Sequence, residues 1–106
     1  MIFPEITSHQ LELPSGPGPW TNAGEAPPYP DRATIWASGP IQYRLVVGAS
    51  VLAGPYAHDP ALATPPLVSV PSSMVLQLRN PALGGLAVQA TVCRDIVTQR
   101  STGLPS

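Results

Sequence analysis

The chain has 106 residues, a formal net charge of −1 and only 10% charged residues, with no lysine among its basic residues. This length fits one small domain, and so little basic charge excludes the patches that neutralise nucleic-acid phosphates. The 43% share of hydrophobic residues excludes wholesale disorder, because disordered chains combine low hydrophobicity with high net charge.

Signals for membrane insertion, export and disulfide bonding are missing from the sequence. No apolar run reaches the ~20 residues that a transmembrane helix needs. The chain begins Met-Ile-Phe-Pro-Glu-Ile, so we expect no secretory signal, which requires a basic region before an apolar core. Cys93 is the only cysteine, so neither an internal disulfide nor a cysteine-based zinc cluster can form.

The low density of charge is the most informative feature of the composition. Five basic and six acidic residues, spread over the ~5,700 Å² that a monomer of this size exposes, leave about one charge per 500 Å². Few charges of either sign and a net charge near zero promote association. We therefore expect neighbouring protein to cover much of the surface. A GC-rich genome also explains the missing lysine, but explains the scarcity of acidic residues less well.

Residues 1–31 are predicted to form an extended, proline-rich N-terminal arm. Proline lacks an amide donor and holds the preceding residue extended, so a helix and a central strand are both excluded here. We expect partial polyproline II structure and a short strand over residues 6–13. Large apolar side chains lie between the prolines, and we predict that they bind a partner chain or grooves of the chain's own domain, a disordered tail being the alternative. These anchors are Phe3, Ile6, Leu11, Leu13, Trp20 and Tyr29.

Residues 32–100 are predicted to form an all-β domain, followed by a short tail over 101–106. Short apolar runs alternate with turn residues, as in a small sandwich or barrel of six or seven antiparallel strands. The first strands are expected over residues 33–37, 41–47, 49–53 and 67–70, with a proline-rich loop over 54–66. The inward face of the second of these strands would carry Ile41, Tyr43, Leu45 and Val47.

A β-hairpin is predicted from two alternating runs, residues 73–79 and 86–93, around a Gly84-Gly85 turn. Residues 96–99 are expected to extend the second strand beyond a kink. A core this small makes the domain marginal alone, and docking or oligomerisation is a common remedy. The inward faces of the hairpin would carry Met74, Leu76 and Leu78, then Leu86, Val88, Ala90 and Val92.

Adjacent His58 and Asp59 are the first candidates for catalytic chemistry. Such a pair could orient a base, with Ser50 or Ser72 as the nucleophile. No nucleophile elbow surrounds either serine, and adjacency in sequence is not triad geometry. We interpret Asp59 as a residue that stabilises the turn before Pro60, and we predict that the protein is not an enzyme.

A thiolate pair and a metal site are the other chemical hypotheses. Cys93 could be activated by His9 or His58, but it lies at the end of an alternating run, where a half-buried thiol is ordinary. A metal set would combine both histidines with Glu5 and Asp59, yet no two of these have ligand spacing on one element. We expect no metal and no cofactor.

Two further groupings have simple structural interpretations. Asp31-Arg32 and Arg94-Asp95 are neighbouring opposite charges, which we expect to be solvated or to cap strand ends. Trp20, Tyr29 and Trp36 could form a stacking platform for a sugar or a proline-rich peptide. Aromatic rings beside prolines more often pack on those prolines.

The expected function is that of a non-enzymatic structural component of a large symmetric assembly. Sparse charge and a long arm fit a bacteriophage virion accessory protein, such as a capsid decoration or cement protein or a head–tail component. It would assemble in the host cytoplasm, reside in the virion, and bind a capsid protein, a tail protein or copies of itself through its arm and β domain. Nucleic acid and membrane are not expected partners. The alternative is a small β-type carbohydrate- or peptide-binding module, which would need an exposed aromatic site.

Overall fold

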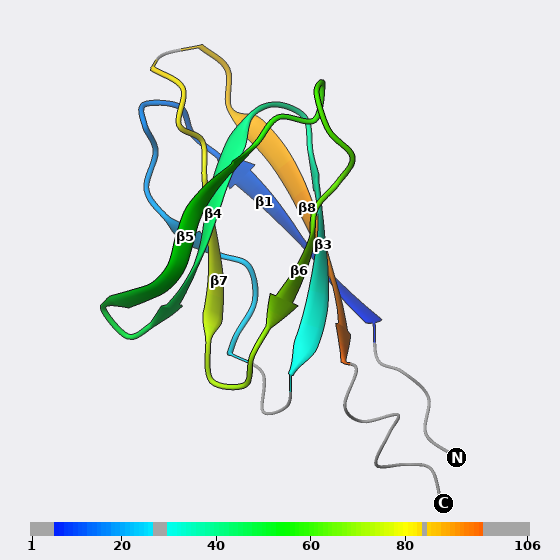
Figure 1. Cartoon of the computed structure of the whole chain (residues 1–106). Helices are drawn as coiled ribbons and strands as arrows, with labels where there is room; N and C mark the ends of the chain where they lie inside the picture. The colour runs from blue at the N-terminus through cyan, green and yellow to red at the C-terminus, as the bar shows by residue number, and fades with distance from the viewer. Residues whose placement is uncertain (1–5, 27–29, 84, 97–106) are drawn as a thin grey trace, which may run out of the picture.

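The computed structural model describes residues 6–26, 30–83 and 85–96, and these form a β-sandwich (Figure 1). Within the described residues there are eight strands, arranged as two packed four-stranded antiparallel sheets. The predicted all-β class is confirmed, as a sandwich rather than a barrel: six of the strands lie between residues 31 and 96, where six or seven were predicted, and the other two come from the arm. The described part of the chain contains no helix long and apolar enough to cross a membrane.

Each sheet combines strands that lie far apart in the sequence. The strand predicted over residues 6–13 is confirmed as β1. It pairs along its whole length with the last strand, β8 (Val88–Ile96), so the two ends of the described chain lie side by side. The first sheet has the order β1 (Ile6–Leu13), β8 (Val88–Ile96), β3 (Asp31–Ala37) and β6 (Leu67–Val70). The second has the order β2 (Thr21–Asn22), β7 (Val75–Arg79), β4 (Ile41–Val47) and β5 (Ser50–His58).

The core lies between the sheets and follows the two-residue alternation of the strands. Leu76 and Leu78 of β7 and Val92 of β8 are fully buried, as the alternation predicts. Burying a side chain of this kind stabilises the fold by about 1.5–3 kcal/mol. Leu86, which was predicted to face inward, is 90% exposed, because it precedes the first residue of β8.

Strand β4 departs from simple alternation near its end. Ile41 and Leu45 are buried as predicted. Val47, however, is 43% exposed, whereas Val46 is only 4% exposed. The pairing with β5 shifts register on both sides of Leu45, between Tyr43 and Val46. The extra residues at these shifts lie on β5, whereas β4 keeps a regular register with β7, so the side-by-side burial of Leu45 and Val46 is a local departure that strict alternation does not predict.

The predicted hairpin of residues 73–79 with residues 86–93 is wrong. β7 pairs with β2 and β4 in the second sheet, whereas β8 pairs with β1 and β3 in the first. The chain therefore passes from the second sheet to the first between the end of β7 and the start of β8 (Figure 1). Each run has one apolar face, which a sandwich buries as well as a hairpin does, so patterning alone does not choose between them.

Asn80 holds this crossing in place. Its side chain is 1% exposed, and its Nδ2 donates to the carbonyl oxygens of Leu13 at 3.3 Å and Leu86 at 3.2 Å. Its Oδ1 accepts the amide of Ala82 at 3.0 Å, and its backbone carbonyl accepts the amide of Gly18 at 3.0 Å. Through its side-chain amide and its backbone carbonyl, Asn80 thus ties the end of β1 and Gly18 to the connection between the sheets.

Strand β5 continues through the region predicted as a loop over residues 54–66. Gly54 and Pro55 together face the single residue Arg44, because pairing passes from Leu45 and Ala53 directly to Tyr43 and Tyr56. This is a bulge in an edge strand, where proline removes no essential ladder bond. The strand therefore ends only at His58, and the loop prediction is wrong for its first five residues.

Asp31 and Arg94 form a buried ion pair at one end of the sandwich. The Arg94 Nη2 lies 3.0 Å from an oxygen of the Asp31 carboxylate, and the two side chains are 4% and 5% exposed. The expectation that these residues are solvated is therefore wrong. β3 and β8 pair antiparallel, which brings Asp31 beside the side chain of Arg94 rather than that of its sequence neighbour Arg32.

Candidate functional site

The structure describes the side chains of three of the six predicted arm anchors. Leu13 is fully buried in the core and Leu11 packs against that core, so both contact the chain's own domain. Trp20 lies against arginines on the outer face of the second sheet. Binding of a partner by these residues stays a prediction. The remaining anchors are Ile6, described only by its backbone in β1, and Phe3 and Tyr29, which lie outside the described residues.

An arginine–aromatic cluster covers part of the outer face of the second sheet. The register places Asn22 and Arg44 on either side of Gln77, and Arg79 opposite Gln42. Arg44 Nε donates to Gln77 Oε1 at 2.9 Å, and Gln77 Nε2 donates to Asn22 Oδ1 at 2.8 Å. Arg79 Nε donates to Gln42 Oε1 at 2.8 Å. We name the following set the Trp20 cluster: Trp20, Asn22, Gln42, Arg44, Gln77 and Arg79.

The Trp20 ring lies against both arginines of this cluster. The Arg44 Cζ is 4.1 Å from the ring centroid and the Arg79 Cζ is 4.6 Å from it. Each contact is worth ~0.5–2 kcal/mol, more where water is excluded. The structure records no ion pair between either guanidinium and a carboxylate of the described residues. The cluster is therefore a positively charged patch on a chain of low charge.

A second candidate surface is the apolar hairpin, which we define as residues 47–57 of β4, β5 and their turn. Figure 1 shows it projecting beyond the neighbouring strand β7. β5 is an edge strand, and its nine residues include no Asp, Glu, Lys or Arg. Large apolar side chains are exposed along the apolar hairpin: Val47 at 43%, Val51 at 41%, Leu52 at 54% and Tyr56 at 50%.

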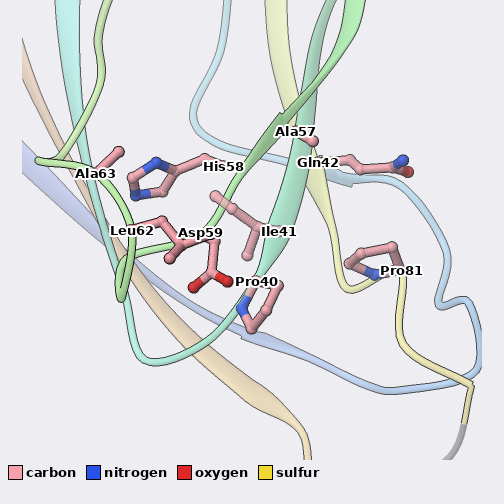
Figure 2. Close-up of a pocket in the computed structure, with 9 residues that line it drawn as sticks. All are labelled: Pro40, Ile41, Gln42, Ala57, His58, Asp59, Leu62, Ala63 and Pro81. Carbon is pink, nitrogen blue, oxygen red and sulfur yellow. The ribbon is translucent and has the colours of Figure 1, made fainter.

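A pocket of about 400 Å³ lies where β4 begins and β5 ends (Figure 2). The His58 side chain is 7% exposed, and its buried Nε2 has no hydrogen-bond partner. The Asp59 carboxylate accepts the amide of Ala61 at 2.9 Å, as expected for a turn residue. Figure 2 shows this carboxylate directed towards Pro40 and away from the His58 ring. The pair is therefore not arranged as an oriented catalytic dyad, and the pocket lining includes neither serine nor cysteine.

The other chemical groupings are not brought together among the described residues. Cys93 lies on β8 between Ser8 and Thr34 of the neighbouring strands, in the first sheet. His9 instead approaches Gly24, where an added Cβ would lie 2.9 Å from the His9 Nε2. No cluster of three or more histidine, cysteine, aspartate or glutamate side chains suited to a metal occurs in the described part of the chain.

The aromatic platform proposed from the sequence is divided between the two sheets. Trp36 is on β3 in the first sheet, whereas Trp20 packs on arginines of the second. Tyr29 lies outside the described residues.

No protein-family model, curated protein or solved structure matches this chain. What the chain does must therefore be inferred from its own surfaces.

Both candidate surfaces were only partly visible in the sequence. The alternation of residues 41–47 and 73–79 places Gln42 and Arg44 on one polar face, and Gln77 and Arg79 on another. It does not indicate that these faces are adjacent, because β7 was assigned to a different partner strand. The first part of the apolar hairpin agrees with the strands predicted over residues 41–47 and 49–53, but Gly54 and Pro55 indicate a loop and conceal its continuation to residue 57.

Proposed function

We propose that this chain is a non-enzymatic structural subunit of a larger protein assembly, and that the apolar hairpin is its principal contact with neighbouring subunits. The supporting observation is the edge strand β5, which is long, uncharged and mostly exposed. Such an edge offers unpaired backbone groups to another chain. Pro55 and the bulge interrupt it at one place, but it lacks the charged residues, especially lysine, that commonly protect edge strands. The chain has no lysine anywhere.

Burial of the hairpin side chains favours association on energetic grounds. Val51, Leu52 and Tyr56 are each 41–54% exposed, and covering apolar surface is worth about 25 cal/mol per Å². β5 contains no Asp, Glu, Lys or Arg, so no charged side chain has to lose its water when another chain covers this strand. An interface of ~1,200–2,000 Å² would place these residues at its centre and draw its rim from the surrounding sheet.

The setting that we propose is the particle of a bacterial virus, with the chain as a decoration, cement or head–tail protein. The absence of lysine and the presence of 15 prolines fit a GC-rich host. A small domain with few charges fits a protein whose surface is largely covered by other subunits. The partner would be a capsid protein, a tail protein or another copy of this chain.

Sedimentation tests the proposal. The purified chain, alone and mixed with the particle's major capsid and tail proteins, is expected to sediment in complexes. Substituting Val51, Leu52 and Tyr56 with threonine, which keeps strand propensity, is expected to release monomers with unchanged circular dichroism. The matched control replaces Trp36 and Leu67 with threonine; these residues are 54% and 62% exposed on the first sheet, and their replacement is expected to leave the complexes intact. A wild-type chain that stays monomeric in every mixture, or hairpin variants that assemble normally, would contradict the proposal.

A further inference from the structure

We propose that the Trp20 cluster is a binding site for carboxylate side chains, supplied by an acidic segment of a neighbouring subunit. The identity of the neighbour rests on the proposed function, whereas the chemistry of the site does not. The site is separate from the apolar hairpin, because it lies over β2, β7 and β4 rather than along the edge strand β5.

The two guanidinium groups are oriented before any ligand arrives. Gln77 accepts from Arg44 Nε, Gln42 accepts from Arg79 Nε, and Trp20 lies against both groups. These contacts use the Nε donors and one face of each arginine, and among the described residues no hydrogen bond uses a terminal nitrogen of either. The terminal Nη donors are the ones that form paired hydrogen bonds with a carboxylate. Orientation in advance lowers the entropic cost of binding.

The electrostatics of the cluster favour an anion. Both Cζ atoms lie within 4.6 Å of one ring centroid, so the two positive charges are at most ~9 Å apart. The face of the Trp20 ring and the surrounding water reduce this repulsion in part, and a negative charge nearby would reduce it further. Bringing a carboxylate between the Nη groups would neutralise charge that the folded chain leaves concentrated at one place.

No described carboxylate of the chain itself forms an ion pair with the Trp20 cluster. Asp31 binds Arg94, Asp59 caps its own turn, and Glu12 accepts a hydrogen bond from Gln89. Glu25 is exposed, and no ion pair joins it to a described arginine. The described residues therefore supply no counter-charge to the Trp20 cluster, and we propose that another molecule supplies it.

An acidic protein segment fits this site better than nucleic acid does. Nucleic-acid binding depends on many phosphate contacts, made by arginine and lysine over an extended surface. Here two arginines form one compact patch, on a chain whose net charge is −1. A nucleic-acid strand long enough to bind through many phosphates would extend past this patch, whereas the carboxylates of a short acidic segment would all lie close to its two guanidinium groups.

Tryptophan fluorescence provides a direct test with the intact chain. Substituting Trp36→Phe leaves Trp20 as the only tryptophan, so its emission reports on the cluster. Titration with a hexaglutamate peptide at low salt is expected to change this emission saturably. The paired substitution Arg44→Gln and Arg79→Gln is expected to weaken binding at least tenfold. Replacing both arginines with lysine keeps the charge but removes the planar donors, and is expected to weaken binding several-fold.

The controls separate this site from general charge effects and from the apolar hairpin. Arg32→Gln removes one positive charge from β3 in the other sheet, and the threonine variant of the hairpin disrupts only the proposed assembly contact; both are expected to bind hexaglutamate as the parent does. Failure of the parent to bind, undiminished binding by either arginine-pair variant, or tighter binding of a DNA duplex than of hexaglutamate would overturn the proposal. Loss of assembly with retained peptide binding would bear on the hairpin alone.

Discussion

Gly54 lies directly against the backbone of Arg44. A Cβ at residue 54 would be 3.2 Å from the Arg44 Cα and 2.9 Å from the carbonyl oxygen of Tyr43, and the glycine has a φ of +91°. The bulge that needs this glycine lies opposite the residue that carries one guanidinium of the Trp20 cluster. The shape of the apolar hairpin and the position of that arginine therefore depend on one close backbone approach.

The first prediction concerns this approach. Gly54→Ala is expected to lower the free energy of unfolding by about 3 kcal/mol, because a side chain there is strained in φ and collides with backbone atoms. Gly48→Ala is the matched control, since Gly48 has a φ of +58° but no atom within 4 Å of an added Cβ. It is expected to cost only about 1 kcal/mol. Urea denaturation measures both, and equal losses would show that the contact with Arg44 is unimportant.

The second prediction concerns the buried ion pair. Arg94→Met leaves the Asp31 carboxylate buried without its cation and removes the donor that the Ala23 carbonyl accepts at 2.7 Å. The expected loss is about 3–5 kcal/mol of unfolding free energy. Adding Asp31→Leu to this variant is expected to restore much of the stability, because apolar pairs often replace buried ion pairs without loss. A double variant no more stable than Arg94→Met would contradict this account.

The class of fold was predictable because one rule governs most of the core. Where a strand has one buried face, every second residue is apolar, and Leu76, Leu78 and Val92 obey this rule. Which strands pair is a different question, answered by contacts between distant residues. Asn80 is an example: its amide binds Leu13, far away in the sequence, and no local pattern indicates that bond.

The candidate surfaces were harder to predict for the same reason. The Trp20 cluster exists only because β2 and β4 both pair with β7, which places Asn22, Gln77 and Arg44 in one row. A polar face on a single strand is what any half-exposed strand presents. The apolar hairpin depends on a bulge that accommodates Gly54 and Pro55, residues that ordinarily indicate a loop.

The third prediction concerns Asn80. Asn80→Ala is expected to destabilise the domain by about 1–3 kcal/mol, because it leaves the buried carbonyl of Leu13 and the amide of Ala82 without their hydrogen bonds. Ser15→Ala is the control in the same region, as the hydrogen bond of the Ser15 hydroxyl to the carbonyl of Gly85 is long, at 3.4 Å. It is expected to be nearly neutral. Thermal unfolding of the three proteins distinguishes these outcomes, and a stable Asn80→Ala variant would refute the role assigned to this amide.

The fourth prediction is a dependence of stability on alkaline pH. Burial raises the pKa of Tyr43 above its ordinary value of 10.0, and the nearby Tyr56, whose ring centroid is 5.4 Å away, raises this pKa further. The folded state therefore holds the Tyr43 proton more tightly than the unfolded state does. The resulting stabilisation is fully present below pH 10 and is lost as the pH rises through the folded-state pKa.

Tyr43→Phe tests this directly, because the variant lacks the titrating hydroxyl but keeps the ring. The difference in unfolding free energy between the wild type and Tyr43→Phe is expected to be constant below pH 10 and to shrink above it. Tyr56→Phe removes the second cause alone, so tyrosinate absorbance should show a smaller rise in the pKa of Tyr43 in that variant. If the wild type and Tyr43→Phe lose stability in parallel as the solution becomes alkaline, the pKa of Tyr43 is the same in the folded and the unfolded state, which would contradict the prediction. The contact between β4 and β5 would then be open to water at the base of the apolar hairpin.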